Sequence, residues 1–403
     1  MFVRTCLVAA LLASAALPVH AQSWGERRVH QSLIVLDTHF DTPANLSRPG
    51  WNIMDRHDVA VDGTQVDYPR MVSGGVDGGF FAIFTPQGAR GPEGDLKARD
   101  AALVRGLEIH EMVAANPKQF EIALTPDQAL DIARRRKRFV FISMENGNPF
   151  GKDLSLMKTF YAFGVRLMGP VHFLNNELGD SATDKPEWGG LSPLGKQFVA
   201  EANRMGIVLD ASHSADTVLD DMLALSKAPI ILSHTGSRAI FNSPRNIDDA
   251  HLKALAAKGG VIQINAFSNY MIAPVKIAER DAALAGLAKK MQAPGKRTEA
   301  EVVALTAERR EIDARWPVPR ATFDDFMKHV LHAIDVAGID HVGMSGDFDG
   351  GGGLAGLEDI TDYPKITAAL LKAGYSKDDV AKFWGGNVLR VMREAQALAE
   401  KPQ

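Results

Sequence analysis

Short apolar runs rich in β-branched or aromatic residues recur along the chain, separated by stretches with helical periodicity. Near-continuous apolar strands are typical of a parallel sheet buried on both faces. We predict eight strands, at Leu33–Thr38, Gly79–Thr85, Phe139–Met144, Val165–Val171, Ile207–Ala211, Ile230–Ser233, Val261–Ala266 and Val342–Gly346. Amphipathic stretches between most of them predict helices, at Lys97–Ala115, Leu154–Phe163, Pro193–Met205, Ala215–Leu225, Asp248–Ala257 and Phe323–Ala337.

Eight strands that alternate with helices are the number that closes a (β/α)8 TIM barrel. A doubly wound open sheet is the alternative, because element boundaries read from a single sequence are inexact. Residues 270–320 do not fit the repeat, being charged and helical in pattern. We predict that they form an insertion between strands 7 and 8 near the barrel mouth, either as a lid or as an outer helix pair. Residues 22–403 are expected to form one domain, since barrels with insertions reach this size.

The first residues have the pattern of a secretory signal peptide. Arg4 precedes the apolar stretch Leu7–Leu17, and Val19-His20-Ala21 offers a small-residue cleavage site, which predicts removal of residues 1–21. Cys6, the only cysteine, would leave with this segment, so the mature protein would have no disulfide and no thiolate ligand. We expect an exported protein, periplasmic or secreted, without a membrane anchor.

The overall composition narrows the function classes. A hydrophobic content of 46% supports a large core, and the formal net charge is -4. The slightly acidic balance, without a basic stripe, argues against nucleic acid as a partner.

Seven residues of the types that bind metal ions follow the predicted strands. The active sites of barrel enzymes lie at the carboxyl ends of the strands, where all seven fall. In an extended chain His39 and Asp41 point to the same side, so both can reach one metal ion. A lone strand-end histidine is usually structural, but four histidines and three carboxylates at one face indicate a site. The seven residues are His39, Asp41, Glu145, His172, His213, His234 and Asp347.

Imidazole and carboxylate ligands together favour Zn²⁺, Co²⁺ or Mn²⁺. Three histidines with Asp41 and Glu145 are too many for one tetrahedral zinc ion with an open position, and suit two ions that share one carboxylate. Two such ions can hold a bridging hydroxide and polarise a carbonyl. The chain has no G-x-S-x-G motif for a competing serine nucleophile. The other mature histidines fall in loops, in helices or at the opposite barrel end, where we expect surface or packing roles.

The same residues resemble the motifs of the membrane (renal) dipeptidase family from about residue 33 to 395. The order and spacing of the motifs make the resemblance specific. They are His39-x-Asp41, Glu145, Pro170-Val171-His172, Ser212-His213, Ser233-His234, Pro244-Arg245-Asn246, Gly346-Asp347-Phe348-Asp349-Gly350 and Gly385-Gly386-Asn387-Val388-Leu389-Arg390-Val391.

The resemblance implies a zinc-dependent dipeptidase and a role for each residue. His39 and Asp41 would hold one zinc ion, His213 and His234 the other, and Glu145 would bridge the two. His172 would stabilise the oxyanion of the scissile carbonyl. Arg245 would bind the C-terminal carboxylate of the substrate, a role that suits a bidentate guanidinium. Asp347 would contact the nucleophilic water and the substrate amine, and move the proton from nucleophile to leaving group.

The substrate implied is a free dipeptide, with a D-residue at its C-terminal side as one option, and a homodimer is implied by analogy. Alternative substrates for the same metals are a β-lactam, an N-acyl amino acid or a lactone. Arg245 discriminates among them because a simple lactone lacks a carboxylate. A non-enzymatic binding protein or decayed enzyme would have lost a ligand, and none is lost. After His172 the chain departs from the Thr-rich stretch of animal members, which predicts a different side-chain preference.

Overall fold

The structure, a computed structural model, describes residues 23–291 and 296–400. The predicted signal peptide, residues 1–21, lies outside the described residues. None of the helices in the described part of the chain is long and apolar enough to cross a membrane.

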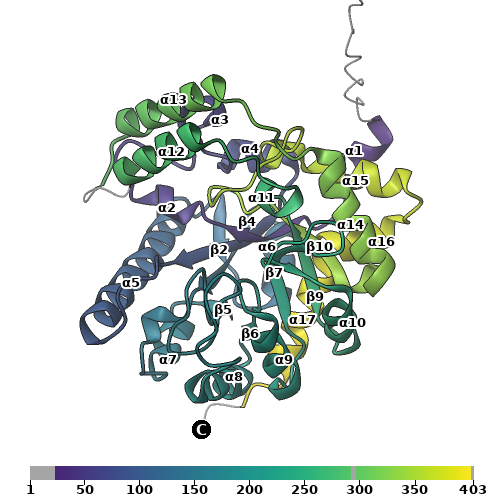
Figure 1. Ribbon diagram of the computed structural model, residues 1–403. Helices are drawn as coiled ribbons and strands as arrows, with labels where there is room; N and C mark the ends of the chain where they lie inside the picture. The colour runs from purple at the N-terminus through teal and green to yellow at the C-terminus, as the bar shows by residue number, and fades with distance from the viewer. Residues whose placement is uncertain (1–22, 292–295, 401–403) are drawn as a thin grey trace, which may run out of the picture.

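All eight predicted strands are present, and every paired strand is parallel to its neighbours (Figure 1). Their bounds are β1 Leu36–Phe40, β2 Gly78–Phe84, β4 Arg138–Glu145, β5 Val165–Met168, β6 Val208–Leu209, β7 Ile231–Ser237, β9 Val261–Asn265 and β10 Val342–Ser345. Two short strands were not predicted: β3, Phe120–Ile122, pairs with β4, and β8, Asn246–Ile247, pairs with β7. Both are too short for their apolar pattern to stand out in the sequence.

The strands close into a ring through two seams. One sheet has the order β1-β2-β4-β5-β6, and the other contains β10-β9-β7. At the first seam Asp210 bridges Ile231, and the backbone N–H of Ala211 donates to the Ile231 carbonyl at 2.8 Å. At the second, Phe40 bridges Phe348. These seams confirm the predicted (β/α)8 barrel and exclude the open doubly wound sheet.

The six predicted helices are also present. Two of them, α8 and α14, have the predicted bounds because both ends carry clear capping residues. The helix α8 begins after Ser192, whose side chain accepts from the Gly195 N–H, and it ends at Gly206 with a left-handed φ of 70°. The helix α5 begins at Pro92 and not at Lys97. The six are α5 Pro92–Ala115, α7 Leu156–Ala162, α8 Pro193–Met205, α9 Asp216–Leu225, α10 Asp249–Ala257 and α14 Phe323–Ala337.

Several further helices were not predicted, either because they are short or because they follow the last strand. They are α1 Trp24–His30, α2 Pro43–Leu46, α3 Val59–Asp62, α4 Tyr68–Gly74, α6 Pro126–Arg134, α11 Ser268–Met271, α15 Tyr363–Lys372, α16 Lys377–Ala381 and α17 Asn387–Ala397, with the short turns η1 Asn148–Phe150, η2 Ile339–His341, η3 Ile360–Asp362 and η4 Lys382–Gly386.

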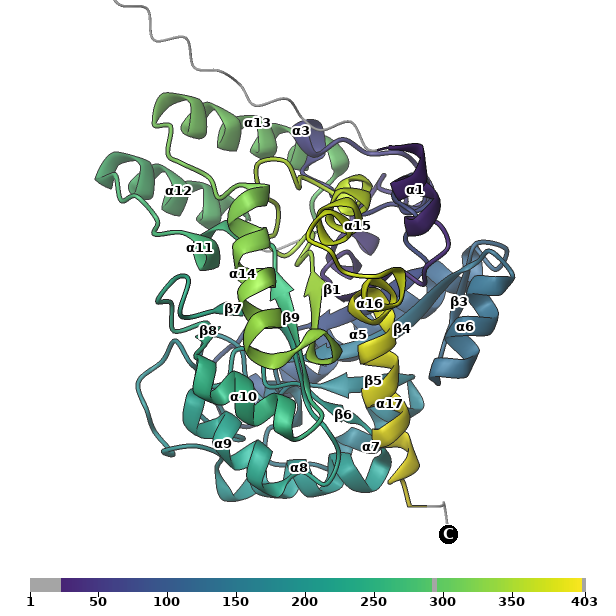
Figure 2. The same cartoon turned by 90° about the vertical axis from the view of Figure 1, so that its right-hand side faces the viewer.

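The helix α17 covers the amino-terminal end of the barrel (Figure 2). Its apolar face joins Leu36, Phe80 and Val261 in one buried cluster. Its Arg390 donates to the carbonyl of Gly259, just before β9, at 2.8 Å. Because this end is filled, the carboxyl end is the end that remains available for a site.

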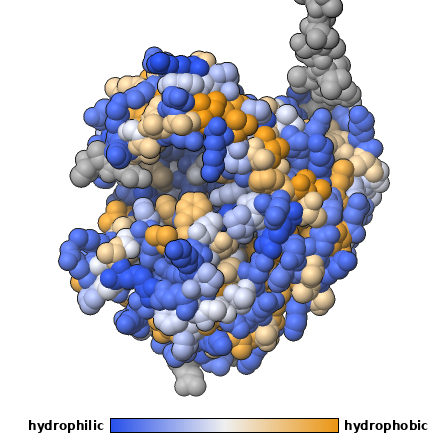
Figure 3. Space-filling view, viewed as in Figure 1, coloured by the Kyte–Doolittle hydropathy of each residue, from blue (hydrophilic) through white to orange (hydrophobic). Residues whose placement is uncertain are grey.

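The predicted insertion consists of α12, Ala278–Met291, and α13, Glu299–Arg315. An ion pair of 2.7 Å between Arg280 and Asp313 joins the two helices. The pair lies over α3, in the loop that follows β1, and Glu299 forms an ion pair of 2.9 Å with Arg48 of that loop. The helices are thus on the carboxyl side of the barrel, and Figure 3 shows a hollow in the surface below them.

Candidate metal centre

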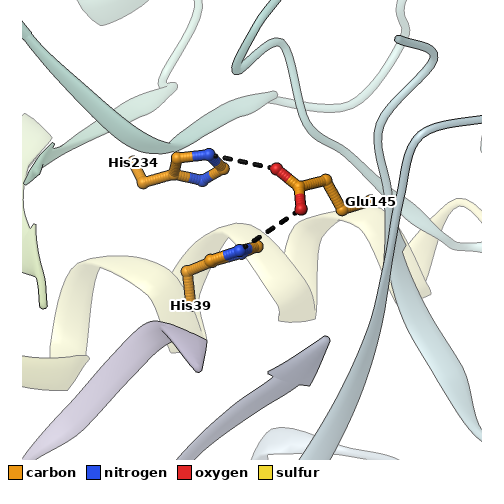
Figure 4. A group of neighbouring side chains, drawn as sticks. All are labelled: His39, Glu145 and His234. Carbon is orange, nitrogen blue, oxygen red and sulfur yellow. Dashed lines mark ion pairs between the residues drawn. The ribbon is translucent and has the colours of Figure 1, made fainter. Parts of the chain in front are cut away.

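Glu145, the last residue of β4, lies at the centre of four histidines that come from four other strands or strand ends. Its Oε1 is 3.1 Å from His213 Nε2, 3.3 Å from His234 Nε2 and 3.7 Å from His172 Nε2, and its Oε2 is 3.5 Å from His39 Nε2. In Figure 4, His39 and His234 point at the two oxygens of this one carboxylate. The structure therefore places Glu145 between the histidines that the sequence analysis grouped with it.

The two remaining predicted carboxylates, Asp41 and Asp347, lie beside His39. His39 Nε2 is 3.4 Å from Asp41 Oδ2, and ligand atoms of His39, Asp41 and Asp347 all lie within 4.8 Å of one another. Gly350 borders both carboxylates, and a Cβ at this position would collide with each of them. The chain thus brings all seven predicted residues to one end of the barrel.

A buried aspartate that sequence reasoning missed positions His39. Asp37, two residues earlier on β1, accepts the backbone N–H of His39 at 2.9 Å and that of Gly346 at 2.8 Å. The hydroxyl of Tyr363, from α15, also donates to Asp37. These bonds fasten the end of β1 to the end of β10. In the sequence, the available signal was the position of Asp37 itself, a carboxylate two residues before His39 in an apolar run.

The histidine His213 follows β6 and adopts a left-handed backbone conformation, with φ 66°. Such a conformation is rare for a residue with a Cβ and is held by its surroundings, as is common at functional sites. His213 Nε2 lies 2.8 Å from His234 Nε2, so both rings are directed to the same position.

A second buried aspartate fixes the tautomer of His234. Asp210 Oδ1 accepts the backbone N–H groups of Ser212 and Ser233, each at 2.9 Å, and its Oδ2 accepts the Ser233 hydroxyl. Because the Ser233 proton is given to Asp210, the Ser233 oxygen accepts from His234 Nδ1 at 2.8 Å. The lone pair of His234 Nε2 is then directed into the cluster, toward Glu145.

The two sides of Glu145 differ in electrostatics. Burial opposes a charge on His39, but Glu145 and Asp41 raise its pKa well above the usual value. Burial and the charge of Arg245 lower the pKa of His213 well below its usual value. Burial lowers the pKa of His234 to about 4, so this imidazole is neutral at pH 7.

The same histidines act on Glu145. Burial opposes ionisation of its carboxyl, but the charge of His39 above all holds its pKa well below the usual range. The carboxylate is therefore charged.

Asp347 and Asp349 have different surroundings although only one residue separates them. Asp347 Oδ2 accepts from Asn265 Nδ2, on β9, at 2.9 Å, and no other hydrogen bond to its carboxylate is present among the described residues. Both carboxylate oxygens of Asp349 are taken, by Gln65 N at 2.7 Å and Thr42 Oγ1 at 2.6 Å. Burial raises the pKa of Asp347 to about 7 and that of Asp349 to about 6. Asp349 therefore holds the neighbouring loops together, whereas Asp347 faces the cluster.

The guanidinium of Arg245 is buried next to the cluster, in the segment between β7 and β8. Its Nη2 donates to the carbonyl of His234 at 3.2 Å, and its Nε is buried without a partner. Its Cζ lies 5.1 Å from the ring centre of Tyr270. Within residues 23–291 and 296–400 it has no ion pair with a carboxylate, so a charged donor is left for an anionic ligand.

His172 lies at the rim of the cluster, after β5. Its ring centre is 4.7 Å from that of Phe84 and 4.0 Å from that of Phe173. Burial lowers its pKa. A neutral imidazole between two phenyl rings is held at a fixed angle beside Glu145.

The donor set fits divalent metal ions. The lone pair of His234 Nε2 and the anionic Glu145 carboxylate face each other at 3.3 Å, an arrangement that repels unless a cation lies between the two atoms. Nitrogen and carboxylate donors are what Zn²⁺ and its neighbours prefer. The bonds from Asp210 through Ser233 to His234 are the usual outer support of a metal-ligating histidine.

The histidines predicted to have surface or packing roles bond outside this cluster. One of them, His57, lies with Asp62 and Glu299, but the cation Arg48 already pairs with both carboxylates. The partners of the others are Thr367 for His30, Phe163 for His110, Asp248 for His251, Ser237 for His329, Asp249 for His332 and Gly260 for His341.

A (β/α)8 barrel with buried histidines and carboxylates at the carboxyl ends of its strands defines the class of metal-dependent hydrolases. Within that class, the sequence model of the family described as membrane dipeptidase (Peptidase family M19) matches residues 25–403. The chain belongs to this family and is a metallo-dipeptidase.

Curated relatives and solved structures agree with this assignment. The dipeptidase tcpJ of Claviceps purpurea (strain 20.1) is 29% identical over 344 residues, which span 83% of this chain and 70% of that protein. The probable dipeptidase PvdM from Pseudomonas aeruginosa has a TM-score of 0.79 at 30% identity, over 93% of this chain and 98% of that one. A metallo peptidase from Rhodobacter sphaeroides, liganded with a phosphinate mimic of L-Ala-D-Ala, has a TM-score of 0.70 at 24% identity, over 90% and 99%, and shares the fold.

Proposed function

We propose that this dipeptidase uses two zinc ions per chain and that Glu145 bridges them. His39 and Asp41 would hold one ion, and His213 and His234 the other. The observation that supports this most directly is the fixed tautomer of His234, whose Nε2 lone pair faces the Glu145 carboxylate at 3.3 Å. A single ion on either side would leave donors on the other side unsatisfied.

The metal pair, when bound, supplies the Lewis acidity that lowers the pKa of a water molecule and polarises the scissile carbonyl. Asp347 accepts the proton of that water and passes it to the leaving amine. Asn265 holds one of its two oxygens, which leaves the other available for this transfer. His172, at the rim, donates to the oxygen of the carbonyl as negative charge develops there.

Arg245 binds the C-terminal carboxylate of the dipeptide. Its guanidinium is buried and has no carboxylate partner among the described side chains, so a substrate carboxylate would complete its bonding. The group that Arg245 would bind is the C-terminal carboxylate, which L- and D-residues have in common. We therefore include dipeptides with a C-terminal D-residue among the substrates.

Hydrolysis of paired substrates tests this assignment. Arg245→Ala should mainly raise KM, because the carboxylate is bound in both ground and transition states. A charge-assisted pair in a partly dry pocket contributes about 1.5–3 kcal/mol, or roughly 10- to 150-fold. Amidation of the dipeptide should cost wild-type enzyme a similar factor and the variant much less. Equal losses in both proteins would mean that Arg245 does not bind the carboxylate.

The substrates assayed should include LL and LD dipeptides, N-acyl amino acids and a β-lactam, since all of them carry a carboxylate. Activity on a carboxylate-free lactone equal to that on dipeptides would contradict the proposal.

We further propose that residues 22–403 form one exported, periplasmic domain after cleavage at Ala21, and that it forms a homodimer. The small-residue pattern before Gln22 supports the cleavage position. The intact mass of the exported protein should lack residues 1–21, and a mass that retains them would contradict export by this signal. Sedimentation of the mature protein tests the homodimer.

A further inference from the structure

We propose that Gln65 is a positioning residue for Asp347: it grips the turn after β10 and so holds the proton-transferring carboxylate against the metal centre. The inference rests on the proposed function, in which Asp347 moves the proton. Gln65 lies in the loop that follows β1, between α3 and α4, and it is buried.

Four hydrogen bonds join Gln65 to the segment after β10. Its Nε2 donates to the carbonyls of Gly352 at 2.9 Å and Glu358 at 2.8 Å. Its backbone N–H donates to Asp349 Oδ1 at 2.7 Å, and its Oε1 accepts the Asp349 N–H at 2.9 Å. The side chain of Gln65 thus uses both of its polar atoms to bond the segment after β10. Among the described residues of the loop that follows β1, no other side chain does so.

The bonds from Gln65 are linked to Asp347 through one residue, Gly352. The Gly352 N–H donates to the Asp347 carbonyl at 2.8 Å, and the Gly352 carbonyl accepts from Gln65. Release of Gly352 would therefore weaken the shorter of the two backbone bonds to the Asp347 carbonyl and leave only the longer one, from the Gly350 N–H at 3.3 Å. The Asn265 bond holds only the carboxylate of Asp347 and not its backbone.

The turn also needs outside support. Asp347 has φ 50° and Asp349 has φ 66°, two left-handed residues with a Cβ in one short segment. Such residues persist only where surrounding contacts over-determine them. Gln65 bonds directly to one of the two and, through Gly352, to the other.

A matched control lies at the opposite end of the same strand. Asn387 is buried, and its Nδ2 donates to the carbonyls of Ile339 at 2.7 Å and Val342 at 3.0 Å, where β10 begins. Asn387→Ala removes two amide-to-carbonyl bonds like the two that Gln65→Ala removes, but at the other end of β10 from Asp347. A purely structural role for Gln65 predicts that the two variants behave alike.

The test compares wild type, Gln65→Ala, Gln65→Glu and Asn387→Ala as metal-loaded enzymes, with metal content and melting temperature measured for each. Gln65→Glu keeps the volume but turns the donor that faces two carbonyls into an acceptor. For both Gln65 variants we expect kcat to fall about 10- to 100-fold, as small displacements of a catalytic group do. KM should stay within about 3-fold of wild type. Asn387→Ala should keep its kcat even where its melting temperature falls as far.

Amide hydrogen exchange gives a readout that does not depend on activity. Exchange of a peptide covering 346–353 should rise in the Gln65 variants and not in Asn387→Ala. An unchanged kcat in the Gln65 variants, or equal loss in Asn387→Ala, overturns the proposal. If wild type hydrolyses no dipeptide, the proposed function fails, and exchange alone then decides whether Gln65 holds the turn.

Discussion

The two sides of Glu145 reach the same point in space by different means. On the side of β1 and β10, the donors Asp41 and Asp347 lie in loops, and Asp347 has a left-handed backbone. On the side of β6 and β7, His234 lies within the strand β7, and His213 follows β6 with a left-handed backbone. Each side has a buried aspartate, Asp37 or Asp210, that accepts the backbone N–H of the residue two positions later.

The ligands on the two sides of Glu145 are held in place by different kinds of contact. The imidazole side depends on two neighbouring strands, β6 and β7, which Asp210 joins through its bonds to Ser233, and Ser233 in turn bonds to His234. The carboxylate side depends on contacts between loops that are far apart in sequence, such as Thr42 with Asp349. Changes to distant loop residues should therefore affect proton transfer, whereas changes near β7 should affect metal binding.

Glu145→Gln breaks both sides together and should have the largest effect. The amide loses the charge that each ion shares, so both ions should bind less tightly and hydrolysis should fall to background. Elemental analysis and dipeptide assays on the variant and on chelator-treated wild type would measure this. Active wild-type enzyme with a single ion per chain would contradict the two-metal proposal.

Asp347→Asn against Asp349→Asn divides the carboxylate side. An asparagine at 347 cannot accept the proton, so the chemical step should slow by about 10²–10⁴-fold while metal content stays near two ions. Asp349→Asn keeps an oxygen for the Gln65 N–H and should retain most of its turnover. Single-turnover rates compare the two, and near-normal rates in metal-loaded Asp347→Asn would remove its assigned role.

Ser233→Ala tests the imidazole side. The variant breaks the relay that fixes the His234 tautomer, and loss of such outer partners usually costs about 10- to 100-fold in metal affinity. Competition with a metal-chelating dye would measure the affinity. The control is Ser226→Ala, because Ser226 caps the carboxyl end of α9 and its hydroxyl accepts from Asn203. A loss of kcat at saturating metal, with unchanged affinity, would contradict the division between the two sides.

His30 sharpens the electrostatic contrast, because it is buried like His234 but has no metal to bind. Burial lowers its pKa from 6.5 to about 4. The unfolded chain therefore takes up this proton first as the pH falls, and stability that is complete above pH 6.5 is lost progressively toward pH 4. The loss is about 3 kcal/mol at most. His30→Gln should be less stable at pH 7 but should show a shallower decline in acid.

Unfolding by urea at pH 7.0 and pH 4.5 measures this decline, with His110→Gln as the control. An equal decline in wild type and His30→Gln would show that other groups carry the acid sensitivity. Dipeptidase activity at pH 7 should be unaffected, since His30 bonds to Thr367 and Gly74, outside the metal cluster.

The fold was predictable where each segment carries its own signal. The eight barrel strands are apolar runs buried on both faces, and α8 has clear caps at both ends. The strands β3 and β8 were missed because such short pairings depend on contacts with distant segments. The helix α17 has an amphipathic pattern of its own, and it was missed because it follows the last strand of the repeat.

The sequence by itself determined which histidines and carboxylates gather at one end of the barrel. Histidines and carboxylates at the carboxyl ends of parallel strands must meet at one end of a barrel, and the pattern of strands places them there. The tertiary structure alone decided which of them remain free to react. Asp347 and Asp349 are two positions apart after the same strand, but Gln65 and Thr42 take both oxygens of Asp349. Hydrogen-bond partners come from residues far away along the chain, and only the folded packing of the loops fixes which carboxylate they occupy.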